Sequence, residues 1–178
     1  MVVIRYCILA LALVVGSVSV VAQDKKHFSG VYLGLESGAL DLGDDNGIAF
    51  GGFLGYRYQT DGNMVFGAEL DLIGQNGSRR AGDGDNDGTA LVQLLGTVGF
   101  VAGRENRNLY TFGAGYVGEI DFGDFFDDEG SLPTDGFTIL AGYERALGSG
   151  FSVRVRGQYV DAGRSKGYLA TVGLLFSF

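Results

Sequence analysis

The sequence has little proline, cysteine, histidine or tryptophan, and basic residues are in the minority. Its 178 residues include one proline, one cysteine, one histidine and no tryptophan, and 13 basic residues stand against 21 acidic ones. The formal charge of −8 argues against a basic surface for nucleic acid, so no nucleic-acid partner is expected. The lone cysteine excludes a disulfide framework, so the fold must be stabilised by another means.

Glycine, in contrast, is abundant, with 32 residues. It follows no collagen triplet, and a hydrophobic content of 46% excludes a disordered chain. Inside a helix each glycine costs roughly 0.8–1 kcal/mol relative to alanine, which disfavours a helical bundle. The composition therefore favours an all-β fold, and the length favours a single domain.

Residues 1–22 have the pattern of a secretory signal peptide. Arg5 provides a positive start, an apolar stretch follows, and the segment ends in the small-residue sequence Val20-Val21-Ala22. A retained membrane helix is the alternative, but the apolar stretch is shorter than the roughly 20 residues that span a bilayer. Cleavage would remove Cys7 and leave a mature domain over residues 23–178.

The mature chain contains eight runs in which apolar and small or polar residues alternate with period two. Each run has about 10 residues or more, the length at which a tilted strand crosses a bilayer. The expected strands are 29–42, 47–58, 64–75, 89–102, 108–122, 136–146, 151–160 and 167–178.

One face of each run is large and apolar, whereas the other holds glycine and charge. In the run 151–160, for example, Val153 and Val155 alternate with Arg154 and Arg156. A soluble barrel, such as a lipocalin-like carrier, would place its bulky side chains inside, so this pattern indicates an exterior of hydrocarbon. Strands cross hydrocarbon only as a closed barrel. The sequence therefore predicts an all-β fold, namely a closed eight-stranded antiparallel up-and-down transmembrane β-barrel.

Several charged residues fall on the inward side of this alternation. They must pair or keep water, because an unpaired charge in a closed lumen is costly. Glu144 and Arg154, on neighbouring strands, are the expected pair. Eight strands leave an interior that side chains fill, which favours a polar plug over a narrow low-conductance channel. The inward charges are Glu36, Arg57, Glu69, Asp71, Glu119, Glu144, Arg154 and Arg156.

The connections between strands differ in length. Those at 59–63, 103–107 and 147–150 are short, whereas those at 76–88 and 123–135 are long and acidic. Outer-membrane barrels have short periplasmic turns and long external loops. We therefore expect extracellular loops and two periplasmic termini.

The C-terminal strand has the form of an outer-membrane assembly signal, with a polar residue, a glycine and two aromatics at Thr171, Gly173, Phe176 and Phe178. The chain resembles the OmpA/OmpX-like family of small eight-stranded outer-membrane barrels over 28–178, on this signal and on VYLGLESG (31–38), FGAELDL (66–72) and FTILAGYERAL (137–147). The resemblance implies a monomer in the outer membrane of a Gram-negative bacterium, in contact with its lipid and inserted by the barrel-assembly machinery. Alternatively, Phe178 is an interfacial aromatic.

Two further features of the sequence bear on metal binding and catalysis. Asp83, Asp85 and Asp87 match the start of a calcium loop, but Leu94 replaces its bidentate glutamate, so a flexible acidic loop is the default reading. His27 precedes the first strand, away from the external rim, which argues against general acid–base catalysis. We therefore expect no enzymatic activity and no cofactor.

The remaining functional hypotheses concern the cell surface. The first is a structural anchor for surface display. The second is an adhesin or ligand-binding protein that acts through loops 76–88 and 123–135. Loop 123–135 contains three apolar side chains that could contact a host partner or the lipid at the rim, namely Phe125, Phe126 and Leu132.

Overall fold

The computed structural model describes residues 26–43, 46–77, 89–121, 136–162 and 166–178. They form β1 (Gly30–Asp41), β2 (Asn46–Gln59), β3 (Met64–Gly77), β4 (Thr89–Ala102), β5 (Asn108–Asp121), β6 (Gly136–Gly148), β7 (Phe151–Asp161) and β8 (Lys166–Ser177), with a short 3-10 helix η1 (Arg104–Asn106) between β4 and β5. All eight expected strands are confirmed, with ends shifted by at most two residues. No helix in the described ranges is long and apolar enough to cross a membrane.

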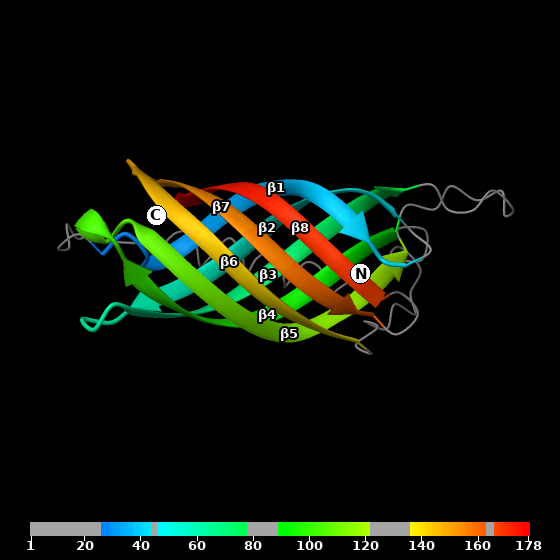
Figure 1. Ribbon diagram of the computed structural model, residues 1–178, viewed down its shortest axis with the longest axis horizontal. Coiled ribbons are helices and arrows are strands. Elements are labelled where there is room, and N and C mark those ends of the chain that lie inside the picture. Colours follow the sequence, from blue (N-terminus) through cyan, green and yellow to red (C-terminus); the bar gives the residue numbers. More distant parts are fainter. Residues whose placement is uncertain (1–25, 44–45, 78–88, 122–135, 163–165) are drawn as a thin grey trace, which may run out of the picture.

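Every strand pairs antiparallel with its sequence neighbours, and β1 closes the sheet by pairing with β8 (Figure 1). The closing register runs from Tyr32 opposite Ser177 to Asp41 opposite Tyr168. A closed sheet has no edge, so all its strands can pair their backbone groups without water. The predicted closed eight-stranded barrel is therefore confirmed.

The predicted exposure pattern is also confirmed. Outward side chains are large and apolar yet exposed, as for Leu35 at 73% and Val155 at 50%. The inward neighbours of Val155, Arg154 and Arg156, are only 8% and 2% exposed. A protein with exposed leucines and buried arginines is suited to a hydrocarbon surround and not to water.

The interior holds more apolar bulk than the sequence pattern predicted. Two apolar clusters lie at opposite ends of the barrel, with the buried charges between them. One contains Phe28, Val65, Val101, Leu109 and Ala146. The other contains Leu40, Leu42, Ala49, Ile73, Leu91, Val117, Val160 and Leu169. The inward face is therefore not only glycine and charge, since apolar side chains seal both ends of a charged middle layer.

The three short connections lie at the end of the barrel that also holds the C-terminus (Figure 1), which we call the turn end. In the β2–β3 turn the Thr60 amide donates to the Met64 carbonyl at 2.8 Å, and Asn63 has a φ of 63°. The β6–β7 turn needs positive φ at Gly148, Ser149 and Gly150. We call the opposite end, where the strands border residues 44–45, 78–88, 122–135 and 163–165, the loop end.

Aromatic rings contact one another along the outer surface near both ends. At the turn end, Phe100 stacks on Tyr110 at 5.0 Å between ring centres. At the loop end, Tyr159 contacts both Phe137 and Tyr168, at 6.0 and 5.5 Å. Such rings suit the two interfaces of a bilayer, with their apolar bodies in hydrocarbon and their polar edges outside it.

An outward arginine at mid-strand should destabilise the barrel much more than one at the rim. Leu94 is 58% exposed near the middle of β4, whereas Met64 starts β3 at the turn end. In lipid vesicles we expect Leu94→Arg to reduce the free energy of unfolding by about 2–4 kcal/mol, and Met64→Arg by about 0–1 kcal/mol. Urea titration, read by the gel migration of folded and unfolded chains, measures both. Equal losses at the two positions would contradict a lipid-facing exterior.

Candidate functional site

The strongest cluster of functional groups is the layer of charges inside the barrel. Strands β3 and β7 lie on opposite walls, four strands apart in the closed order. Glu69 and Asp71 point inward from β3, and Arg154 and Arg156 point inward from β7, because residues two apart share a face of a strand. Glu36 joins them from β1. Two acids on one wall therefore meet two guanidinium groups from the other.

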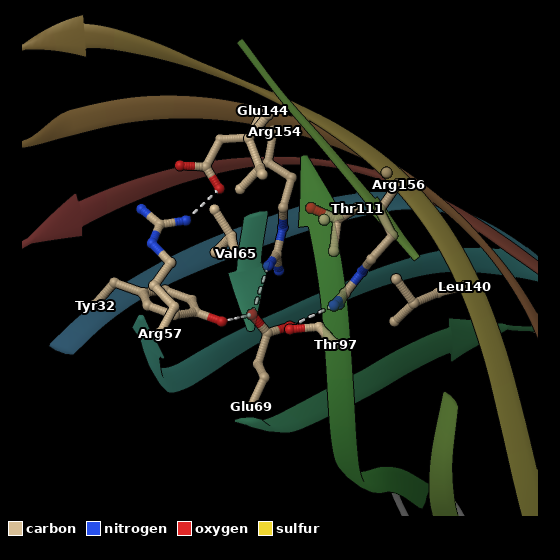
Figure 2. A pocket seen from close by; sticks show the side chains of 13 residues that line it. Tyr32, Arg57, Val65, Glu69, Thr97, Thr111, Leu140, Glu144, Arg154 and Arg156 are labelled. Carbon is tan, nitrogen blue, oxygen red and sulfur yellow. Dashed lines mark hydrogen bonds and ion pairs between the residues drawn. The ribbon is translucent and has the colours of Figure 1, made fainter. Parts of the chain in front are cut away.

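Glu69 is the centre of this layer (Figure 2). Its carboxylate accepts hydrogen bonds from Arg156 at 2.5 Å, from Arg154 at 2.6 Å and from the Tyr32 hydroxyl at 2.6 Å. Both arginines also reach Glu36, and Arg156 donates to Asp71 at 2.7 Å. Charge-assisted bonds of this kind are stronger than neutral ones, and they bind three strands together.

Neutral side chains complete the layer. The Thr171 hydroxyl donates to Glu36 at 2.9 Å. With its amide oxygen turned toward Arg156, Gln158 accepts from the Arg156 Nε atom at 2.7 Å and donates to Gln93 at 2.9 Å. The Arg154 guanidinium also lies 3.8 Å from the centre of the Phe53 ring, a cation–π contact.

A second ion pair lies nearer the turn end. Arg57 donates to Glu144 at 2.8 Å and to the Ser177 hydroxyl at 3.0 Å. Its guanidinium also contacts the rings of Tyr32 and Phe28, at 4.5 and 5.1 Å from their centres. This ion pair thus joins the charged layer to the apolar cluster that contains Phe28.

The segment before β1 holds Phe28 in place. Phe28 is fully buried, and its amide donates to the Gln59 side chain at 3.2 Å. Lys26 forms an exposed salt bridge of 2.7 Å with Asp61 in the β2–β3 turn. The hydrogen bond from Lys26 lowers the pKa of Asp61, and the same bond raises the pKa of Lys26. Phe28 therefore closes the turn end from inside.

The expected pair of Glu144 and Arg154 is not formed, and that prediction is wrong. The two residues are direct register partners on β6 and β7. However, Glu144 bonds to Arg57, and Arg154 bonds to Glu69 and Glu36. In this narrow barrel the long Arg154 side chain reaches Glu69 on the opposite wall and Glu36 on β1, so it contacts two carboxylates and not one.

The layer contains four carboxylates and three guanidinium groups among the described inward side chains. A cavity of about 30 Å³ lies beside Tyr32, Arg57, Glu69 and Glu144 (Figure 2). That volume is enough for water, which needs roughly 10–15 Å³ of such space per molecule. Water at this place could bond to Oε1 of Glu144 and Nε of Arg57, which have no protein partner among the described residues.

The other predicted site residues divide into those that are described and those that are not. Seven of the eight inward charges are buried as expected. The side chain of Glu119 lies outside the described residues, as do Asp83, Asp85, Asp87, Phe125, Phe126, Leu132 and the predicted signal peptide 1–22. The described ranges contain no group of three His, Cys, Asp or Glu residues able to hold a metal.

The residues of the expected assembly signal take different places in β8. Thr171 and Gly173 face the interior, where a Cβ on Gly173 would lie 3.3 Å from that of Glu36. Phe176 and Phe178 lie at the turn end with their rings 5.0 Å apart. The Phe178 amide donates to the Val31 carbonyl at 3.0 Å, which extends the closing seam to the last residue.

Residues 8–178 match the family described as outer membrane protein beta-barrel domain. The chain belongs to this family. It is 32% identical over 143 residues to the 31 kDa outer-membrane immunogenic proteins of Brucella melitensis and Brucella suis. Each alignment covers 72% of this chain and 59% of the relative, so the chain spans about three fifths of these relatives.

Solved barrels share the fold at low identity. The N-terminal β-barrel domain of Pseudomonas aeruginosa OprF has a TM-score of 0.56 and 16% identity, and Neisserial surface protein A has 0.53 and 13%. Both alignments cover 84% of this chain and 98% of the solved one. Ail of Yersinia pestis, solved in a phospholipid bilayer nanodisc, has 0.51 and 15%, with 84% and 100% covered. As a member of the outer-membrane barrel family, the chain presents its apolar exterior to lipid.

Sequence reasoning did not single out several members of the charged layer, namely Tyr32, Phe53, Gln93 and Gln158. The signal was available, because all four have the inward parity of their strands. It was weak because an inward tyrosine or glutamine carries no net charge and resembles the polar residues of many strands.

Removing the charge of Glu69 should destabilise the barrel strongly. Glu69→Gln keeps the shape but leaves Arg154 and Arg156 with less compensation, and breaking a buried ion pair costs about 3–5 kcal/mol. Urea titration in lipid vesicles should show a loss of this size. The control Glu105→Gln breaks the exposed pair with Arg107, and we expect a loss within about 1 kcal/mol. Equal stability of Glu69→Gln and the wild type would show that the layer is not held by charge.

Proposed function

We propose that this protein is a rigid, monomeric and non-catalytic anchor in the outer membrane of a Gram-negative bacterium. The loop end displays the long loops at the cell surface, and both termini lie in the periplasm. The observation that carries the proposal is the filled interior, in which a charged layer lies between two apolar clusters. The charged side chains of this layer bond to one another across the lumen, so they hold the strands of the barrel wall together.

The filled interior supports the anchor over the alternative of a narrow channel. An ion crossing the barrel would have to lose its water against Leu91 and Leu169 at one end and Phe28 at the other. Between them it would have to displace the salt bridges of Arg156. Both steps are expensive, because a charge in an apolar surround costs many kcal/mol.

The same interior supports a non-catalytic role. The carboxylates of Glu36 and Glu69 are occupied by arginines, which leaves them poorly placed to take a proton from a substrate. His27 lies at the turn end beside the ring of Phe28. Neither place is open to the loop end, where a substrate outside the cell would arrive.

Planar-bilayer recordings test the plugged anchor. We expect the purified, folded barrel to give no conductance steps above the bare bilayer, because apolar clusters of described residues occupy both ends of the lumen. A large porin added to the same bilayers shows that steps would be detected. Reproducible steps that grow with salt concentration would contradict the plug and favour the channel.

The last strand supports a proposal about assembly. Its C-terminal Phe178 carries the final hydrogen bond of the closing seam and lies at the turn end, which in this topology faces the periplasm. We infer that the barrel-assembly machinery recognises β8 through Phe176 and Phe178, which project from its end with their rings in contact.

A second candidate function is the binding of a host or surface ligand by the loops. The relatives from Brucella are named outer-membrane immunogenic proteins, which favours a surface role for this chain. The predicted contact side chains Phe125, Phe126 and Leu132 and the calcium candidates Asp83, Asp85 and Asp87 lie in loops 123–135 and 76–88. These sites stay predictions, and they concern the loops and not the barrel.

Protease treatment of intact cells, combined with a loop deletion, separates the two functions. We expect cleavage within 78–88 or 122–135 and none at the turns after Gln59 and Gly148. Cleavage at those turns in intact cells would contradict the proposed topology. If the binding function is correct, a chain in which a short Asn-Gly turn replaces 123–135 should lose adhesion to host cells yet keep its heat-modifiable gel migration. Unchanged adhesion would remove the binding function and leave the anchor.

A further inference from the structure

The outer wall of the barrel is hollowed by a trough of about 640 Å³. The trough crosses four neighbouring strands at right angles to them. Its floor is a row of small residues in direct register, in which Ala39 on β1 faces Ala170 on β8, Ala170 faces Gly157 on β7, and Gly157 faces Ala141 on β6. All four are exposed on the outward face. A Cβ added to Gly157 would meet no atom within 4 Å, which confirms open space above the floor.

Outward side chains flank this trough, and those on its loop-end side line it. Toward the loop end, the next outward row on the same strands contains Asp41, Tyr168, Tyr159 and Ile139. Toward the turn end, it contains Val172, Val155 and Tyr143. Along the floor, Ile48 borders Ala39 at one end and Phe112 borders Ala141 at the other.

The surroundings of the trough determine what can fill it. It is continuous with the apolar exterior that this family presents to lipid, so its occupant must come from the hydrocarbon. An empty trough would forfeit the dispersion contacts of its walls. Neighbouring strands lie about 4.8 Å apart, so a trough that crosses four strands and their flanks is roughly 15–25 Å long. It is as wide as one row of outward side chains, because small residues take the place of large ones in that row.

A second copy of the chain fits this shape poorly. A two-fold axis through the trough would place one hollow against the other and leave both unfilled. A single flexible hydrocarbon chain, in contrast, can follow a narrow trough along its length.

Polar groups stand at one edge of the trough only. The rings of Tyr159 and Tyr168 are in contact at its loop-end bank, and beyond them the Lys166 amine lies 2.9 Å from Asp161. Phenol hydroxyls and an amine are hydrogen-bond donors for a polar headgroup. We propose that the trough is a lipid-binding site that seats one acyl chain of a membrane lipid, whose headgroup lies at the rim formed by Tyr159, Tyr168 and Lys166.

Filling the trough tests this site. Gly157→Leu together with Ala170→Leu places bulk over the floor without a backbone clash at Gly157. The control Gly96→Leu adds the same bulk to an outward glycine on β4, where the nearest atom to a new Cβ is the Ala114 carbonyl oxygen at 3.9 Å. The whole chain is purified from outer membranes in mild detergent, and gel migration confirms that each variant is folded.

Native mass spectrometry then reports the fraction of protein that carries one lipid. We expect this fraction to fall at least ten-fold in the double variant and to stay unchanged in Gly96→Leu. An unchanged fraction in the double variant, or an equal loss in the control, would overturn the proposal. So would a dimer that disappears when the trough is filled, since it would identify a second copy as the occupant.

A second measurement tests the site in a bilayer, and so it also detects a lipid that would be lost during purification. The barrel is placed in phosphatidylethanolamine nanodiscs that contain a lipid with a spin label on its acyl chain. We expect amide relaxation enhancement at Gly157 and Ala170 to exceed that at Gly96 and Ala114 at least two-fold. Equal enhancement on the two walls would show ordinary bilayer contact and overturn the proposal. Neither experiment depends on whether the protein is an anchor or an adhesin.

Discussion

Closure of the sheet by β1 and β8 is the constraint on which the rest of the structure depends. In hydrocarbon no water can pair a free strand edge, so the eighth strand must return to the first. Closure at eight strands makes the lumen narrow, and a narrow lumen brings side chains from opposite walls into contact. The charges of β3 and β7 therefore meet each other and not a water-filled channel.

The charged layer in turn fixes the register of strands that are distant in sequence. A shift of one residue in β7 would turn Arg154 and Arg156 toward lipid and leave Glu69 without a partner inside. Buried ion pairs often add little net stability compared with apolar packing, but losing one partner is severely destabilising. The layer thus penalises wrong registers, while the clusters that contain Phe28 and Leu91 add apolar packing at the two ends.

Sequence alone predicted the strands, the closed barrel and the inward direction of the seven buried charges, because period-two alternation is a local property of the chain. The sequence could not predict which charged side chains bond to each other. Glu144 and Arg154 are adjacent in register, yet each bonds elsewhere, since side-chain length across the lumen decides the contact. It also overlooked inward bulk such as Phe53, because an apolar residue on the polar face breaks the pattern that reveals the face. The predicted role of the loops depends on residues such as Phe125, which lie outside the described residues.

Apart from the turns, glycine has two distinct roles in the strands of this barrel. Inside, glycine makes room for rings, since a Cβ on Gly34 would lie 2.7 Å from an atom of the Phe53 ring and one on Gly55 would lie 2.7 Å from an atom of the Tyr32 ring. These are the rings that pack against Arg154 and Arg57, so the inward glycines support the charged layer indirectly. On the outer face, a Cβ added to Gly157 would have no atom of the chain within 4 Å. Internal packing cannot explain a small residue there, and a space kept for the surrounding lipid can.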